Sequence, residues 1–354
     1  MSDVLILGGS RFIGRRLARE MLDQGHAVTL YTRGRTPDGL GPGVRRLTGD
    51  RRSASDLDRA IAGRSFDVVY DFLSYDAHDA RLAIDAFSGR VRRFVHISTC
   101  SVYWCAGEFP CPVREEDFDG LDVSRERPSS IEYAYGMGKR GAEEALAEAH
   151  RDRGFPMTAV RLPIVGGEED ASLRCAGYVQ RILDGEPLVL PDGGQAPFRH
   201  VYVGDATRTL ASIPDRPGTV GRAYNLACSE ILTLRRVVAA IASALGRRVP
   251  VVGIPAELAR RAMGESYAAW SPYSQQAAQV PCIERARREL EWRTTPFDVW
   301  IERAVQWSAD HLARGGAPPA SAAHRGREAD LVRRWKEALV SLGAEASTSA
   351  ELPG

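Results

Sequence analysis

Short apolar runs alternate with longer amphipathic stretches through the first half of the chain. Residues 4–7 are apolar without interruption and end at two glycines, which is typical of a strand buried on both faces. From Phe12 to Leu22 apolar residues recur at helical spacing, and Gly25 ends that stretch. The strand pattern returns at 27–31, 44–47, 66–72, 94–97 and 157–162, and the helix pattern at 55–62, 76–87 and 132–150. Strands that alternate with helices predict βαβ units, and therefore an α/β fold with a doubly wound parallel sheet.

The pattern becomes less regular after Pro163. Residues 187–197 are rich in loop-forming residues, 201–203 predict one more strand, and helical patterns recur at 234–245, 284–291 and 299–312. We therefore predict that residues 1–165 and 199–227 form the doubly wound domain. Residues 166–198 and 228–312 are then a smaller, interleaved α+β lobe for the substrate. Residues 313–354 are expected to be a partly disordered extension, with one helix at 328–342 and no fixed structure from residue 344 onward.

Composition narrows the class of protein. The formal net charge of +1 gives no electrostatic reason to expect nucleic acid or a membrane as a partner. No basic segment precedes the first apolar run, so we expect no signal peptide and a cytoplasmic protein. The six cysteines form no CxxC pair and have no histidines at zinc-ligand spacing, so reduced thiols and no metal site are expected.

A glycine-rich loop at residues 8–14 (GGSRFIG) lies between the first predicted strand and the first predicted helix. Glycine permits a tight turn and a close approach of the backbone to a pyrophosphate. The N–H groups and the positive dipole end of the following helix then bind that pyrophosphate. In this position the loop predicts a dinucleotide-binding domain of the Rossmann type.

The end of the second predicted strand indicates which dinucleotide binds. An NAD enzyme would have an acidic residue there for the ribose hydroxyls, whereas an arginine favours the 2′-phosphate of NADP. Residues 31–35 (YTRGR) contain no acid. We therefore expect NADP(H) to be preferred, with Arg33 on the 2′-phosphate, and NAD(H) to remain an alternative.

Tyr135 and Lys139 are the candidate catalytic pair. Positions i and i+4 of a helix lie on one face, so the phenol and the ammonium would point the same way. A phenol exchanges its proton poorly at neutral pH, but a neighbouring ammonium favours the phenolate. Only Lys139 and Lys336 are lysine among the 47 basic residues, so a chance match to this spacing is improbable and Lys139 is expected to have a specific role.

These features resemble the extended short-chain dehydrogenases, the family of NAD-dependent epimerases and dehydratases, over roughly residues 3–310. The stretch 94–103 (FVHISTCSVY) is similar to the family's fourth strand and implies Thr99 as the catalytic hydroxyl, with Ser98 and then Ser101 as alternatives. Segments 49–50, 161–163, 201–205 and 223–226 match further family motifs. The resemblance implies that the cofactor is bound by Gly8, Ser10, Arg11, Phe12, Ile13, Gly14, Arg33, Asp50, Arg51, Phe72, Lys139 and Pro163.

The chain also departs from the family pattern. Arg11 replaces the middle glycine of the loop, as in an atypical subgroup with a GG-[ST]-RF-[IL]-G loop, and it either reaches a cofactor phosphate or lies across the loop surface. Cys100 and Ser101 stand where 4,6-dehydratases carry Asp-Glu, which argues against that elimination chemistry. Cys100 is then either an acid/base of lowered pKa or a buried thiol. Many members that bind a nucleotide-sugar have a diphosphate-binding arginine at the position of residue 198, but here the arginine follows one residue later. The substrate-binding candidates are therefore Arg199 and the adjacent His200, together with Cys100 and Ser101.

The resemblance implies an oxidoreductase or epimerase that transfers hydride at a hydroxyl or ketone carbon, with Tyr135 as acid/base and a sugar, nucleotide-sugar or similar polyhydroxylated substrate. One alternative is a ketoreductase of a non-sugar natural product. An alternative of another class is an RNA-binding or regulatory protein without turnover, because the Arg11-type loop also resembles chloroplast stem-loop RNA-binding proteins. A homodimer through the helices at 76–87 and 132–150 is expected from the resemblance.

Overall fold

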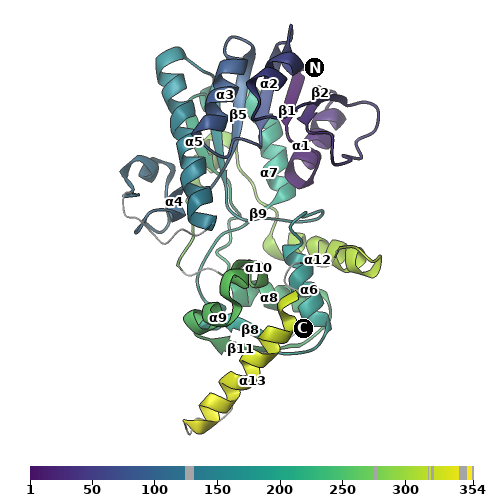
Figure 1. The fold of residues 1–354 in the computed structure, drawn as a ribbon, viewed down its shortest axis with the longest axis vertical. Coiled ribbons are helices and arrows are strands. Elements are labelled where there is room, and N and C mark those ends of the chain that lie inside the picture. The colour runs from purple at the N-terminus through teal and green to yellow at the C-terminus, as the bar shows by residue number, and fades with distance from the viewer. Residues whose placement is uncertain (124–130, 275–276, 318, 320–322, 343–348, 353–354) are drawn as a thin grey trace. The chain divides into compact units, whose positions relative to one another are not determined.

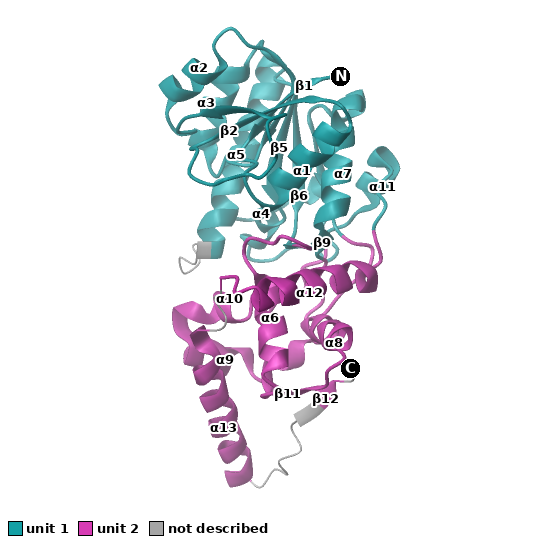
Figure 2. Ribbon diagram, turned by 90° about the vertical axis from the view of Figure 1, so that its right-hand side faces the viewer, with its two compact units in different colours: residues 1–165, 200–227, 281–294 teal, residues 166–199, 228–280, 295–354 magenta. Residues whose placement is uncertain are grey.

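The computed structural model describes residues 1–123, 131–274, 277–317, 319, 323–342 and 349–352 (Figure 1). These residues form two compact units (Figure 2). The first contains residues 1–165, 200–227 and 281–294, and the second contains residues 166–199, 228–280 and 295–354. The chain therefore passes between the units several times.

The first unit is built on a seven-stranded sheet in the order β10-β6-β5-β4-β1-β2-β3, in which every pairing is parallel. This is the doubly wound α/β sheet that the alternation of patterns predicts. Its strands are β1 (Asp3–Leu7), β2 (Ala27–Thr32), β3 (Arg45–Thr48), β4 (Phe66–Asp71), β5 (Val91–Thr99), β6 (Met157–Leu162) and β10 (Arg222–Asn225). A separate short pair is formed by β7 (Val165–Gly166) and β9 (Val201–Tyr202).

Helices cover both faces of this sheet. On one face α1 packs against α7, and on the other α3 packs against α2 and α5. Two of the starts have side-chain caps: Ser53 accepts a hydrogen bond from the Asp56 amide at α2, and Asp76 accepts one from the Asp79 amide at α3. The helices are α1 (Phe12–Asp23), α2 (Ala54–Ile61), α3 (Ala77–Phe87), α4 (Ser101–Trp104), α5 (Ile131–Arg153), α7 (Val203–Ser212) and α11 (Glu284–Leu290).

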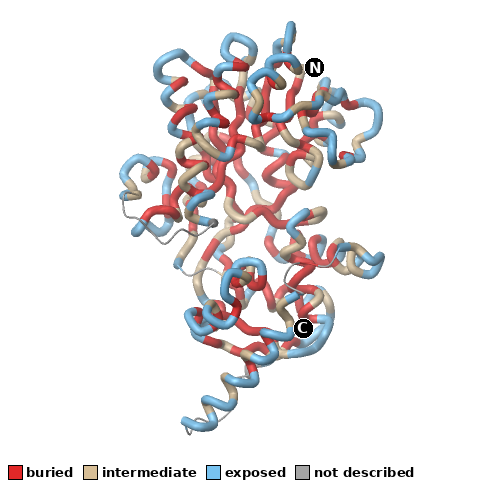
Figure 3. The backbone as a smooth tube through the Cα atoms, in the orientation of Figure 1, coloured by how far each residue is buried: buried red, intermediate tan, exposed pale blue. Residues whose placement is uncertain are grey.

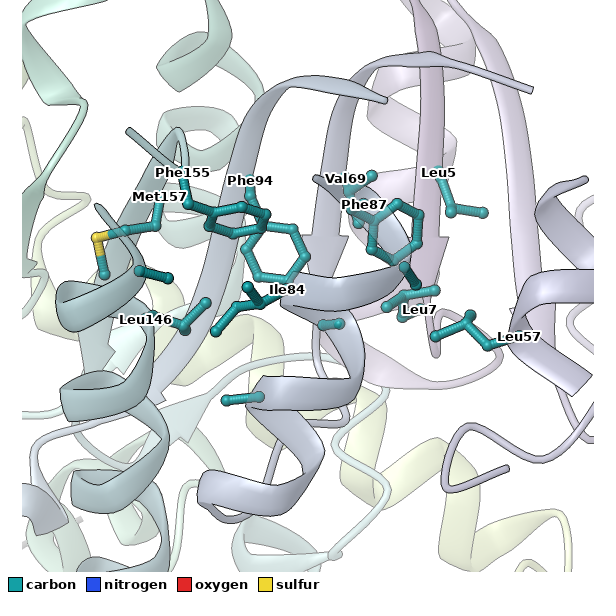
Figure 4. Close-up of a cluster of buried hydrophobic side chains, with 14 of the residues drawn as sticks. Leu5, Leu7, Leu57, Val69, Ile84, Phe87, Phe94, Leu146, Phe155 and Met157 are labelled. Carbon is teal, nitrogen blue, oxygen red and sulfur yellow. The ribbon is translucent and has the colours of Figure 1, made fainter. Parts of the chain in front are cut away.

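A continuous apolar core fills the space between the sheet and the α2, α3 and α5 helices (Figure 4). Its centre is aromatic: the Phe94 ring lies 6.0 Å from that of Phe87 and 5.1 Å from that of Phe155. Complete burial of such a side chain contributes about 1.5–3 kcal/mol, so this core holds α3 and α5 firmly against strands β4 and β5. The residues that follow those two strands belong to the candidate site.

The second unit has a small mixed sheet in the order β12-β11-β8 and a group of helices. Its apolar cluster includes Val252, Met263 and Trp270, and Figure 3 shows that each unit has its own buried interior. The elements are α6 (Arg174–Leu183), β8 (Leu188–Pro191), α8 (Leu234–Ala244), β11 (Val249–Ile254), α9 (Ala256–Met263), α10 (Tyr267–Trp270), α12 (Phe297–Ala313), α13 (Arg325–Ser341) and β12 (Ser349–Leu352).

Two boundaries differ from the sequence prediction. Residues 281–294 were expected in the substrate lobe, but α11 packs on β10 in the first unit, where Glu289 accepts hydrogen bonds from Arg222 and Tyr224. The expectation of no fixed structure from residue 344 onward is wrong for Ser349–Leu352, which pairs antiparallel with β11. That pairing was not predictable from local pattern, because its partner lies about a hundred residues earlier in the chain. The rest of the tail, 343–348 and 353–354, lies outside the described residues.

None of the described helices is long and apolar enough to cross a membrane.

Candidate active site

The glycine loop joins β1 to α1 through a very close approach of backbone segments. Gly8 and Gly9 have φ of +106° and +89°, values that side chains of L-residues rarely permit. A Cβ on Gly14 would lie 2.7 Å from the Gly9 Cα, so α1 contacts the loop directly. The first turn of α1 contains no acidic residue, and the Arg11 side chain does not cap it. The N-terminal amides of α1 therefore suit an anion such as a pyrophosphate.

A cavity of about 650 Å³ opens beside this loop, which is within the range for a small-molecule site. It lies wholly in the first unit, and five arginines line it, namely Arg11, Arg33, Arg35, Arg51 and Arg52, together with the two carboxylates of Asp50 and Asp79. Ten of the twelve predicted cofactor residues line it: Gly8, Ser10, Arg11, Phe12, Ile13, Gly14, Arg33, Asp50, Arg51 and Phe72. Lys139 and Pro163 do not. The excess of positive charge and the shape of the loop fit a phosphorylated dinucleotide.

The arginines differ in how they are held. Arg33 is exposed, whereas the Arg11 guanidinium crosses toward the segment after β2 and donates to the Thr36 hydroxyl at 3.4 Å. Arg51 is buried and donates at 2.9 Å to Asp71, the last residue of β4. Burial alone would raise the pKa of Asp71, but the neighbouring Arg51 and His96 hold it below its usual value. Arg51 is thus fixed in a buried part of the cavity wall, while Arg11 and Arg33 are exposed.

Tyr135 and Lys139 occupy one face of α5, as their spacing predicts. The Lys139 side chain is 3% exposed, and its Nζ donates to the Ile97 carbonyl oxygen at 2.8 Å. Burial lowers the Lys139 pKa to about 8, although the Asp71 and Glu143 carboxylates oppose this. Tyr135 lies one turn earlier and is 40% exposed, so its ring remains accessible.

The two glycines between them explain how α5 reaches its neighbours. A Cβ on Gly136 would lie 2.6 Å from the Ser101 carbonyl oxygen, and one on Gly138 would lie 2.5 Å from the Tyr75 carbonyl oxygen. Both distances are shorter than real Cβ contacts allow. The helix therefore lies directly against the segment after β5 on one side and against the segment after β4 on the other.

The three candidate hydroxyls have different surroundings. Thr99, at the end of β5, donates to the Ser101 hydroxyl at 3.1 Å and accepts from the Ser101 amide at 3.2 Å. Ser98 points beneath α5 instead, where its hydroxyl donates to the Glu143 carboxylate, and it is buried. The Ser98 hydroxyl is therefore already engaged beneath α5, whereas Thr99 and Ser101 bond to each other, and Thr99 stays the predicted catalytic hydroxyl.

The remaining substrate-binding candidates, Cys100, Arg199 and His200, differ in burial and in the unit to which they belong. Cys100 is fully buried, its thiol donates to the Arg161 carbonyl oxygen at 3.6 Å, and burial raises its pKa well above the usual range. Of the two interpretations of Cys100, an acid/base of lowered pKa or a buried thiol, these surroundings match the buried thiol. His200 is buried in the first unit, whereas Arg199 belongs to the second unit and donates to the Ser229 carbonyl oxygen at 3.2 Å.

A buried polar network beneath the site was not anticipated. Glu143 pairs with Arg161 at 2.6 Å, and Arg161 donates to the Tyr103 hydroxyl, which donates at 2.8 Å to Asn225. Glu143 lies four residues after Lys139, so helical spacing alone could have identified it. Tyr75 was also missed, because nothing in its local sequence marks it.

No group of three or more His, Cys, Asp or Glu side chains within the described residues is arranged to hold a metal ion.

The chain is similar to known proteins in sequence and in fold. A family model described as the NAD dependent epimerase/dehydratase family matches residues 4–227. The chain is 30% identical over 260 residues to the 2′-dehydrokanamycin reductase of Streptomyces kanamyceticus, which covers 72% of this chain and 70% of that protein. It is 24% identical to the chloroplast stem-loop binding protein of 41 kDa b of Arabidopsis thaliana, over 70% of this chain and 65% of that protein.

The fold is shared with solved enzymes of low sequence identity. The dTDP-glucose 4,6-dehydratase of Bacillus anthracis in complex with NAD superposes with a TM-score of 0.68 at 18% identity, covering 88% of this chain and 98% of that chain. At this identity the likeness concerns the fold alone.

Proposed function

Because the chain belongs to the NAD-dependent epimerase/dehydratase family, we propose that it is an NADP(H)-dependent oxidoreductase that interconverts a ketone and an alcohol on a sugar or similar polyhydroxylated substrate. The observation that carries this proposal is the pair on α5. Tyr135 is accessible, and Lys139 is buried one turn away with its ammonium fixed by the Ile97 carbonyl. Such a pair suits proton transfer to and from a substrate oxygen.

The preference for NADP(H) is supported by the charges around the cavity. Arg11, Arg33 and Arg35 line it near the end of β2, and residues 31–36 contain no carboxylate there to bind the ribose hydroxyls. A 2′-phosphate would be stabilised by this arrangement, because a planar guanidinium binds phosphate in a bidentate manner. NAD(H) has no 2′-phosphate, so these arginines would have no phosphate to bind there.

The bound nicotinamide would supply or accept the hydride at the reacting carbon. Tyr135 would donate its phenolic proton to the developing alkoxide during reduction, or accept it during oxidation. The Lys139 charge lowers the cost of the phenolate, and the Thr99 hydroxyl would donate a hydrogen bond to the substrate oxygen and orient it. No side chain with the acidity for elimination stands at Cys100 or Ser101, which favours redox chemistry over dehydration.

Reduction of a ketone on a glycoside-like substrate is the direction we favour. The relative from Streptomyces kanamyceticus is named for the reduction of a dehydro form of kanamycin, and it aligns with 72% of this chain. Epimerisation would use the same residues, with oxidation and reduction on one substrate.

Calorimetric titration with NADPH and NADH tests the cofactor, beside the Arg33→Ala variant. We expect NADPH to bind more tightly than NADH, and the variant to lose about tenfold or more in NADPH affinity with little change for NADH. Arg90→Ala, an exposed arginine outside the cavity, is the matched control. A screen of keto-sugars for NADPH oxidation, with Tyr135→Phe as the inactive comparison, then tests the reaction.

Failure of both nucleotides to bind would overturn the proposal. The stem-loop-binding class would then lead, and salt-sensitive binding of a stem-loop RNA would be the measurement that supports it.

A further inference from the structure

Tyr75 lies in the loop between β4 and α3 and is held from two directions. Its amide donates to the Asp79 carboxylate at 3.0 Å, and its carbonyl is the group that Gly138 of α5 approaches. Tyr75 lines the cavity beside the glycine loop and is 51% exposed. Its backbone is therefore fixed, while the residue remains accessible from the cavity.

The ring of Tyr75 also lies close to the catalytic pair. The Lys139 Nζ lies 5.0 Å from the Tyr75 ring centroid, in the range of a cation–π contact. The Tyr135 ring centroid lies 6.5 Å away, with the planes tilted by 51°. Tyr75 thus lies next to both members of the pair and also at the wall of the cavity.

The Lys139 ammonium has few partners for a buried charge. It has three N–H donors, and the described residues offer it the Ile97 carbonyl and the Tyr75 ring face. Charged or titratable groups also act on it from the elements packed around it, namely Asp71 of β4, Asp79 of α3, Glu143 of α5, His96 of β5 and Arg51 after β3. An ammonium in such a place is costly unless it is compensated.

We propose that Tyr75 is a positioning residue of the reaction, whose ring face covers the Lys139 ammonium, stabilises its charged form and directs it toward Tyr135. This inference rests on the proposed function, because it assigns Tyr75 to the same site. It adds to the site a residue that belongs neither to the Tyr135–Lys139 pair nor to the glycine loop.

The physical need for such a group follows from the burial of Lys139. Burial lowers the Lys139 pKa to about 8, and a further decrease would leave a large neutral fraction at neutral pH. Neutral lysine would no longer favour the Tyr135 phenolate. The negative face of an aromatic ring stabilises a cation without adding a competing charge. Burial, with the carboxylates of Asp71 and Asp79, raises the pKa of the Tyr75 phenol, so the ring stays neutral while it acts.

The scarcity of lysine makes a direct test possible. Lys139 and Lys336 are the two lysines of the chain, so protein labelled with ¹³C at the lysine Cε gives two side-chain signals. The pH titration of each signal by NMR would be compared in the wild type, Tyr75→Leu and Tyr75→Phe, all without cofactor. Leucine keeps apolar bulk over the ammonium but removes the π face, whereas phenylalanine keeps the face and removes the hydroxyl.

In Tyr75→Leu we expect the Lys139 midpoint to fall by about 0.5–1 pH unit. Tyr75→Phe should retain the wild-type midpoint, and Lys336 should titrate identically in all three proteins. Tyr75→Met serves as a second ring-free variant if the leucine variant does not fold. Turnover that depends on the charged Lys139 should fall off at high pH, and the midpoint of that fall should shift downward by the same amount in Tyr75→Leu.

Equal Lys139 midpoints in the wild type and the ring-free variants would overturn the inference, as would a Tyr75→Phe variant that behaves like Tyr75→Leu. The NMR titration needs neither cofactor nor substrate. A wrong assignment of the reaction would therefore leave its result unchanged, and the two failures can be told apart.

Discussion

At the scale of single residues, the site combines a costly charge with the groups that compensate it. Lys139 is almost completely buried, and its ammonium is stabilised by the Ile97 carbonyl, the Tyr75 ring and three carboxylates. The lowered pKa means that burial disfavours the ammonium more than these contacts favour it, so we expect a lower free energy of unfolding than with an apolar residue at this position. Catalytic groups are commonly held at such a cost.

Lys139→Met is therefore predicted to abolish turnover and to raise the free energy of unfolding by about 1–2 kcal/mol at pH 7. The folded-state pKa of about 8 lies below the ordinary value of 10.5, so the unfolded chain binds more protons between these values and wild-type stability rises with pH across that window. Urea unfolding at pH 7 and pH 9.5 should show the difference between the two proteins narrowing. A methionine variant less stable than the wild type at pH 7 would contradict this reasoning.

Glu143 is predicted to be the opposite case, a buried charge whose removal destabilises. Burial alone would raise its pKa, but Arg161 and the Ser98 hydroxyl hold it below its usual value. Glu143→Ala leaves the Arg161 guanidinium buried without a counterion, so we expect a loss of about 3–5 kcal/mol in urea unfolding. Glu148→Ala is the control on the same helix, because Glu148 is exposed and should cost below about 1 kcal/mol.

The pH dependence of this effect has a definite sign. A carboxylate with a lowered folded-state pKa contributes stability above its unfolded pKa and loses it as the pH falls through the folded-state value. The difference between the wild type and Glu143→Gln should therefore be full at pH 7 and shrink below about pH 4. A difference that stays constant down to pH 3 would mean that the ion pair is not its source.

At the scale of elements, α5 shows how a helix can place two loops at once. Glycine inside a helix costs about 1 kcal/mol relative to alanine, yet α5 has three glycines within residues 136–141. Two of them are explained by the close approach to the Ser101 and Tyr75 carbonyls. The helical pattern predicted α5 and its catalytic face, but not this approach, because the contact depends on loops that lie far away in the sequence.

Gly138→Ala is predicted to be destabilising although alanine is the better helix former. Its Cβ would lie 2.5 Å from the Tyr75 carbonyl oxygen, so α5 or the β4–α3 loop must move, at a cost of about 1–3 kcal/mol. Gly141→Ala is the matched control on the same helix, since its Cβ would lie 3.6 Å from Ala77, an ordinary contact. We expect it to be neutral or to stabilise by up to about 1 kcal/mol in urea unfolding. Equal effects of the two substitutions would refute the close-approach explanation.

At the scale of the whole molecule, the two units differ in how far the sequence could predict them. The first unit repeats a local strand–helix pattern, so its sheet and the positions of Tyr135, Lys139 and the glycine loop followed from periodicity and spacing. The second unit pairs β8, β11 and β12 from segments that are far apart, and no local pattern encodes such pairing. Glu143 could have been found from its spacing to Lys139 on α5. Tyr75 could not, because only tertiary packing brings the β4–α3 loop to the site.

The homodimer through α3 and α5 stays a prediction, testable by light scattering.

The last prediction concerns the independence of the two units. Glu328 of α13 is fully buried and pairs with Arg181 of α6, which is 1% exposed, while also accepting a hydrogen bond from the Val189 amide at 2.8 Å. Glu328→Ala leaves this guanidinium uncompensated, so we expect a loss of about 3–5 kcal/mol confined to the second unit. Glu337→Ala is the control on the same helix, because its side chain is 62% exposed.

Because each unit has its own apolar core, the first unit should still bind NADPH in Glu328→Ala at low temperature. Hydrogen exchange should then show faster exchange in α6, α9 and α13 with unchanged protection of β1, β4 and β5. Uniformly faster exchange throughout the chain would show instead that the two units unfold as one cooperative body.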